Sequence, residues 1–287
     1  MSVLDFFADM AHNPFLATGL WAGILASVAC GTIGPYVVTR RIVFLAGAVA
    51  HIAVGGLGAA IYLSHRFPDL FGGLRPIYGA GLAAVVSAVV LAFVHDRVAE
   101  RIDTLIGALW AVGMAVGILL IKLTPGYQTE LMSYLFGNLA FVGRGDVVLM
   151  AVLDLVIVGA VVLLHKRFLA ICLDPEQAEL QDVPVLGTHV ILLVLVALTV
   201  ICLTQVVGLI LVIALLSLPA ATAAHHVTRL PPQILIATVF GLVVTTVPRI
   251  AVYGTRVSPE AAIVLAAGLL YLLSAVWSGR RRGRGSV

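Results

Sequence analysis

Long apolar stretches separated by short polar breaks occupy almost the whole chain, and they restrict its fold more than any other feature. About 20 residues of α-helix span the hydrocarbon core of a bilayer. With 61% hydrophobic and 11% charged residues, a water-soluble fold of this length could not bury its apolar surface. The sequence therefore predicts an all-α polytopic membrane protein, a bundle of eight or nine transmembrane helices. The candidate segments are Pro14–Val38, Ile42–Ser64, Tyr78–Val94, Thr104–Leu123, Val147–Leu164, Val190–Val206, Gly208–Ala224, Ile234–Val247 and Ala261–Trp277.

The boundary between the sixth and seventh segments is unusual, because almost nothing separates them near Val207. Either a very tight turn joins two crossings, or Gly208–Ala224 enters only part of the membrane. Apolar segments recur along residues 1–287 and leave no room for a soluble module. We therefore expect one membrane domain.

Lysine and arginine are distributed unevenly between the two sides that nine crossings would create. If the C-terminus is cytoplasmic, eleven of the 17 basic residues lie inside, as the positive-inside rule favours. The longest polar loop on the cytoplasmic side is then 165–189. The same side holds four terminal arginines, which favour an anchor at phospholipid headgroups over a nucleic-acid tail: Arg280, Arg281, Arg282 and Arg284.

A single ionisable residue, His51, interrupts the second segment near the middle of the hydrocarbon layer. An imidazole buried there without a partner is unfavourable, so it should face the protein interior or a polar cavity. Gly47 and Gly55 lie one turn away on either side, which predicts a groove of little side-chain bulk. The pattern fits either a metal or proton site on a transport path, or a histidine that is hydrogen-bonded to a neighbouring helix.

Other polar groups in or beside the spans have structural as well as functional explanations. Asp154, in the fifth segment, is either a second metal ligand or an interhelical hydrogen bonder. Asp103 is expected to cap the fourth segment. His225 and His226 are adjacent, so on a helix they should point to different sides and make a poor bidentate site, which favours a structural role over the alternative of metal release there. Pro219 should kink the seventh segment, either as a gating hinge or as a packing feature.

A short helix is predicted within the longest cytoplasmic loop. Asp174 is a typical cap residue, Pro175 suits the first helical position, and Glu176 lies near the positive end of the helix dipole. Ala178 and Leu180 then offer a small apolar face for a partner.

The sequence also argues against several kinds of chemistry. It has no GxxxxGK[ST] phosphate-binding loop, so ATP hydrolysis is not expected in this chain. HExxH and GxSxG strings are absent as well, which argues against an intramembrane hydrolase. The three cysteines, Cys30, Cys172 and Cys202, form no CxxC pair and predict neither a disulfide framework nor a zinc knuckle.

Six stretches, in this order along the chain, resemble the permease subunit of the ABC importers for zinc, manganese and iron, most closely the zinc permeases: Gly31–Gly58, Arg101–Leu120, Leu131–Phe141, Leu173–Val185, Val206–Val227 and Val257–Ser274. The resemblance implies a complex in the bacterial inner membrane with a second permease copy, a cytoplasmic ATPase dimer that uses ATP, and an extracytoplasmic metal-binding protein. It implies no permanently bound cofactor, because the metal is the transported substrate. The loop at 165–189 would couple the permease to the ATPase.

The chain departs from this family next to His51. Members commonly carry an aspartate four residues before the histidine, and this chain has Gly47 there. In a homodimer, the two copies of His51 could instead converge at the symmetry axis, a nitrogen site that suits zinc better than manganese. Polar residues on the predicted outer side could contact the metal-binding protein: Asp69, Glu130, Asn138, Asp146 and Glu260.

We therefore expect a transport subunit, not an enzyme, that carries zinc. Manganese or iron remains an alternative within the same family. A secondary metal transporter that needs no ATPase is a further alternative. Such a transporter should show an internal repeat and interrupted helices in both halves, and the sequence indicates neither.

Overall fold

The computed structural model describes residues 3–95, 102–126, 137 and 142–284, and the regular structure of this part is helical. Eight helices there are long and apolar enough to cross a membrane, and Val212–Ala224 is a shorter apolar helix. The predicted all-α bundle of eight or nine crossings is thus confirmed. The helices are α1 (Val3–His12), α2 (Pro14–Thr39), α3 (Val43–Arg66), α4 (Pro68–Phe71), α5 (Pro76–His95), α6 (Ile102–Lys122), α8 (Arg144–Leu173), α9 (Pro175–Leu180), α10 (Val185–Ala224), α11 (Leu230–Ala251) and α12 (Pro259–Arg284).

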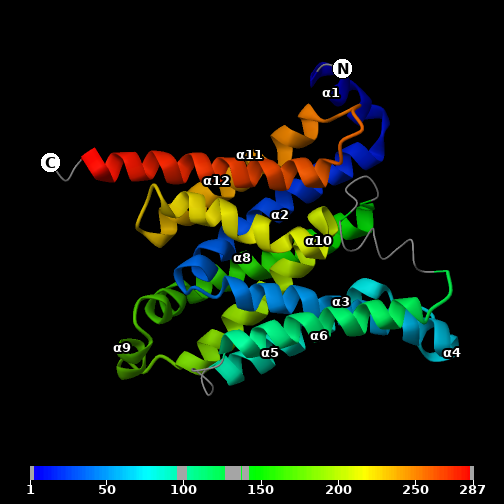
Figure 1. Cartoon of the computed structure of the whole chain (residues 1–287), viewed down its shortest axis with the longest axis horizontal. Helices are drawn as coiled ribbons and strands as arrows, with labels where there is room; N and C mark the ends of the chain where they lie inside the picture. The colour runs from blue at the N-terminus through cyan, green and yellow to red at the C-terminus, as the bar shows by residue number, and fades with distance from the viewer. Residues whose placement is uncertain (1–2, 96–101, 127–136, 138–141, 285–287) are drawn as a thin grey trace.

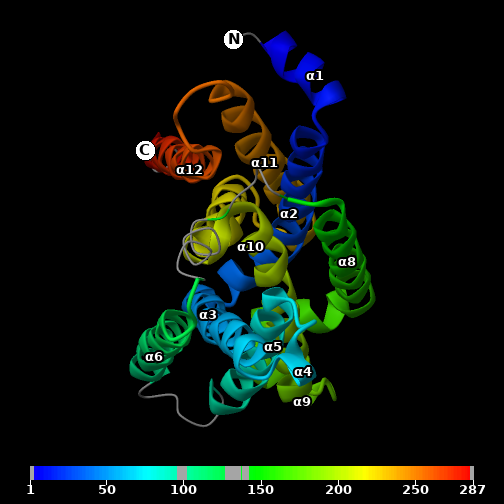
Figure 2. The same ribbon diagram turned by 90° about the vertical axis from the view of Figure 1, so that its right-hand side faces the viewer.

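Helix α10 lies at the centre of the bundle and packs against α2, α3, α5, α8, α11 and α12 (Figure 2). It consists of two arms, because Gly208 has the non-helical dihedral angles φ 74° and ψ 171°. The chain reverses at this point, and the second arm returns toward the end of the molecule where α10 began (Figure 1). The break predicted near Val207 is therefore a sharp turn, and the returning apolar helix is shorter than a full crossing.

The two ends of the bundle carry different elements. One end holds α9, the turn between α10 and α11, and the last residues of α12 (Figure 1). The opposite end holds α1 and α4, so the two termini lie at opposite ends of the molecule. An odd number of crossings places the two termini on opposite sides of a membrane. The arrangement therefore agrees with the nine predicted segments when the returning arm of α10 is counted as one of them.

Small residues allow the helices to approach closely. Gly113 and Gly117 of α6 form a GxxxG face against α3, and a Cβ atom at Gly113 would lie 2.8 Å from Cα of Ile52. Between α2 and α11, the hydroxyl groups of Ser27 and Thr245 are hydrogen-bonded at 3.0 Å. In lipid, such close backbone approach and interhelical hydrogen bonds are the main sources of helix association.

Candidate functional site

His51 points from α3 into the protein, where only 4% of its surface is exposed. Its imidazole stacks on the indole of Trp110 in α6, with ring centroids 4.4 Å apart and planes inclined by 27°. Its Nδ1 atom has no hydrogen-bond partner within the described residues. The predicted interior orientation is confirmed, and Nδ1 is a buried ring nitrogen whose hydrogen-bonding capacity is unused among the described residues.

Gly47 lies on the same face of α3 as His51, and neighbouring side chains fill the space that a side chain at this position would occupy. A Cβ atom at this position would lie 2.8 Å from Cζ3 of Trp110 and 2.8 Å from Cδ1 of Ile213. The indole therefore occupies space that a carboxylate at position 47 would need. Gly55, one turn beyond His51, lies against the carbonyl group of Gly113 and serves helix packing.

The part of the chain that the structure describes contains no group of three or more His, Cys, Asp and Glu residues arranged to hold a metal ion. Among these residues, His51 therefore belongs to no preformed set of three metal ligands. Structural metal sites usually have four protein ligands, whereas a site from which an ion must leave needs fewer. One copy of the described chain can offer only the second kind of site at this position.

Asp154 of α8 is buried, with 5% of its surface exposed, and does not join His51. Helix α8 packs against α2 and α10, whereas α3 packs against α5, α6 and α10. The Oδ1 atom of Asp154 lies 4.0 Å from the thiol of Cys202, and Oδ2 has no hydrogen-bond partner among the described residues. The carboxyl group thus makes a weak interhelical contact with α10, which is one of the two roles its sequence position predicted.

The interruption of α10 lies at Gly208 and not at Pro219. Pro219 is buried inside the returning arm, where the helix continues through it. The combination of φ 74° and ψ 171° at Gly208 is accessible almost only to glycine. Irregular backbone at membrane depth is tolerated where protein surrounds it, and Gly208 is buried.

Helix α9 begins as its sequence predicts. The Asp174 carboxylate accepts hydrogen bonds from the backbone N–H groups of Glu176 and Gln177, at 3.0 and 3.1 Å. The expected apolar face is divided, however, because Ala178 is 2% exposed whereas Leu180 is 86% exposed. Ala178 packs toward the last turns of α8, so Leu180 is the apolar residue of α9 that a partner could contact.

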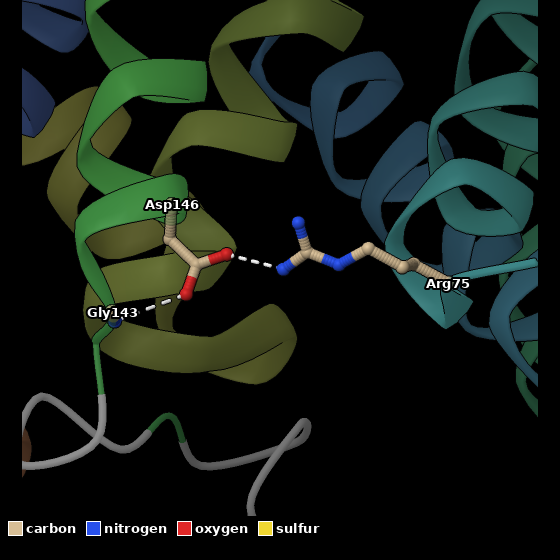
Figure 3. Close-up of polar contacts among 3 residues, drawn as sticks. All are labelled: Arg75, Gly143 and Asp146. Carbon is tan, nitrogen blue, oxygen red and sulfur yellow. Dashed lines mark hydrogen bonds and ion pairs between the residues drawn. The ribbon is translucent and has the colours of Figure 1, made fainter.

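At the opposite end of the bundle, Asp146 is engaged within the chain (Figure 3). Its Oδ1 atom lies 2.6 Å from Nη2 of Arg75, and Oδ2 accepts a hydrogen bond from the backbone N–H of Gly143 at 3.1 Å. The hydrogen bond to this carboxylate raises the pKa of Arg75 above its ordinary value. Asp146 thus caps α8 and joins it to the start of α5, which occupies both oxygen atoms that an outer partner was expected to use.

The other predicted outer residues are in different situations. Asp69 of α4 is exposed, whereas Glu260 in the first turn of α12 is buried. Glu130 and Asn138 lie outside the described residues, as does the side chain of Asp103. Asp69 is therefore the described member of this set that an outer partner could reach.

The adjacent histidines do not point apart as predicted. Helix α10 ends at Ala224, so His225 and His226 follow its last turn, and both rings contact Ser274 of α12. The prediction was wrong because it assumed that the helix continues through the pair.

Sequence reasoning missed three residues that shape these sites, namely Trp110, Ser274 and Arg75. Each acts across helices that are distant in sequence, which a periodic pattern cannot reveal. A signal existed only for Trp110, a large ring within the same segment as the GxxxG glycines.

Comparisons with known proteins agree with this architecture. The sequence model of the ABC 3 transport family matches residues 12–278. The membrane protein slr2045 of Synechocystis sp. is 41% identical over 274 residues, which are 96% of this chain and 94% of that protein. The manganese transport system membrane protein MntC of Halalkalibacterium halodurans is 29% identical over 284 residues, which are 98% of this chain and 94% of that protein.

A solved structure has the same fold. It is PsaBC from Streptococcus pneumoniae in complex with Fab, with a TM-score of 0.83, 26% sequence identity and 95% of both chains covered.

Proposed function

Because the chain belongs to the ABC 3 transport family and is the membrane-spanning permease of a metal ABC importer, we propose that it carries zinc inward across a bacterial inner membrane. The chain is a transport subunit and not an enzyme. ATP is hydrolysed by a separate ATPase subunit, in keeping with the absence of a phosphate-binding loop from this sequence.

The observation that carries the choice of zinc is the chemistry around His51. Its ring leaves Nδ1 unpartnered among the described residues, and the carboxylate position beside it is a glycine whose space an indole fills. A nitrogen ligand without a carboxylate favours zinc over manganese, which prefers oxygen. A second, identical permease would bring a second His51. Water molecules would complete the coordination shell of the zinc ion, which would then be bound weakly enough to be released.

The transport cycle follows from the two ends of the bundle. An extracytoplasmic metal-binding protein delivers the ion at the end that carries α1 and α4, where Asp69 is exposed. The ATPase dimer binds at the opposite, cytoplasmic end, where Leu180 of α9 is exposed. Closure of the ATPases pushes α9, which connects α8 to α10 through short non-helical links, and so moves the helices around His51 between outward and inward access.

Manganese is the second candidate, and the names of relatives favour it. MntC of Halalkalibacterium halodurans, at 29% identity, is named as a manganese transport protein. Under this alternative, oxygen ligands from water and from the buried Asp154 would hold the ion, and His51 would contribute little.

Uptake by the complete complex in proteoliposomes separates these functions. The permease, its ATPase and its metal-binding protein are reconstituted, and zinc and manganese compete for ATP-driven uptake. We expect zinc to be taken up in preference to manganese, and only with ATP and ATPase present. Preferential manganese uptake would contradict the zinc assignment, and uptake without the ATPase would indicate a secondary transporter.

A further inference from the structure

Two imidazole rings at the end of α10 are directed at one hydroxyl group. Nδ1 of His225 and Nε2 of His226 each lie 3.0 Å from Oγ of Ser274. The two rings are supported by aromatic neighbours, His225 by Tyr271 at 5.3 Å and His226 by Phe240 at 6.1 Å between ring centroids. The rings are therefore oriented by packing as well as by the shared hydroxyl.

This cluster opens onto a cleft of about 1130 Å³ between the end of α10, α11 and α12. His226 and Ser274 line the cleft together with Thr222, Trp277 and Arg280. The turn that carries the histidines lies at the same end of the bundle as α9 (Figure 1). In the proposed orientation, an ion that has passed His51 would leave the permease at this end.

The hydrogen bonds at Ser274 show why a cation would fit. A serine hydroxyl has one proton, so at most one ring accepts it, and at least one ring must donate its own N–H to the oxygen. A divalent cation in the same place would take a lone pair from each neutral imidazole and a third from the hydroxyl oxygen. Imidazole is a good ligand for zinc and related divalent metals.

We propose that His225, His226 and Ser274 form an inner binding site for a divalent transition metal ion on its way out of the permease. This proposal rests on the proposed transport function and adds a second metal-binding site to the transport path, after His51. Two imidazoles and a neutral hydroxyl bind less firmly than a closed four-ligand site. The guanidinium of Arg280 lines the same cleft and repels cations, which lowers the affinity further and favours release.

The competing explanation is purely structural. Histidines near a helix C-terminus interact favourably with its dipole, and the contacts to Ser274 would then only attach α10 to α12. Under that explanation, substitution changes stability but not the number of bound metal ions.

The test counts zinc in the purified permease–ATPase complex after equilibrium dialysis. The double variant His225→Gln/His226→Gln is expected to lose one bound zinc per permease. The control His65→Gln alters an exposed histidine elsewhere and should keep the wild-type zinc content. His51→Ala should also keep the ion bound at His225 and His226, which separates this site from the one in the transport proposal.

A gain-of-affinity variant keeps the test decisive if the double variant folds poorly. Ser274→Cys places a thiol at the point that both rings face, and thiolate is a stronger zinc ligand than hydroxyl. We expect its Kd for zinc to fall by about tenfold or more. Equal zinc content in the wild type and the folded double variant, or an unchanged Kd in Ser274→Cys, would overturn the proposal. Zinc binding here without ATP-driven zinc uptake would contradict the proposed function instead.

Discussion

The imidazole of His51 lies nearly parallel to the indole of Trp110, and the same indole fills the space beside Gly47. One ring thus orients the histidine and fills the space that a side chain at position 47 would need. The absence of a side chain at position 47 and the position of the indole are therefore linked in this structure.

The variant Gly47→Asp tests this relationship. Its Cβ atom would overlap Trp110 and Ile213, so we expect a loss of about 1–3 kcal/mol in the free energy of unfolding, and lower zinc uptake. Adding Trp110→Ala opens the space, so the double variant should lose less than the sum of the two single losses. It should also shift uptake toward manganese, because an aspartate then joins His51. Additive losses would show that position 47 and the indole do not share space.

The contact of α3 with α6 predicts a sharp difference between two glycines of α6. A Cβ atom at Gly117 would overlap the backbone of Val54, whereas one at Gly107 would meet nothing within 4 Å. Gly117→Ala should therefore lower the free energy of unfolding by about 1–3 kcal/mol. Gly107→Ala should change it little or raise it by up to about 1 kcal/mol, because alanine favours helix. Thermal unfolding of the purified permease measures both, and equal effects would contradict the close approach.

The sequence determined the helices well because each crossing of a bilayer needs a long apolar run, and such runs are visible in one dimension. The break in α10 was also predictable, since two runs meet at Val207 and Gly208. Contacts between distant segments were not predictable. Asp146, for example, was expected to face a partner, but Arg75, 71 positions earlier in the chain, binds it.

The candidate site, too, was predictable where it depends on local sequence and not where it depends on contacts between helices. The interior orientation of His51 followed from its depth and its glycine neighbours, and the start of α9 followed from its cap residues. The buried position of Ala178 did not, because it depends on how α9 folds back on α8. The convergence of the two adjacent histidines depends on where α10 ends, and helix ends are the least certain feature of a sequence pattern.

The turn at Gly208 should require glycine. Its φ of 74° with ψ of 171° is disfavoured for any residue with a Cβ atom, so Gly208→Ala should cost about 1–3 kcal/mol of stability. The matched control is Gly268→Ala in α12, where a Cβ atom would meet nothing within 4 Å. Thermal unfolding should separate the two variants, and wild-type stability in Gly208→Ala would show that the turn can take another conformation.

Coupling to the ATPase should depend on Leu180. Leu180→Glu replaces the exposed apolar side chain of α9 and should lower ATP-driven uptake at least several-fold without changing the melting temperature. The neighbouring control Glu179→Gln should keep uptake near the wild-type rate. Ala178→Glu, in contrast, should lower the melting temperature, because that side chain is buried. Normal uptake in Leu180→Glu would exclude α9 docking through this residue.

The most direct test of the central claim is ATP-driven zinc uptake by the reconstituted complex with the His51→Ala permease, measured beside the exposed-site control His65→Ala. We predict that uptake in His51→Ala falls to the level seen without ATP, while the control keeps the wild-type rate and both permeases still bind the ATPase. Wild-type zinc uptake by the His51→Ala permease would contradict the claim that this ring handles the transported ion.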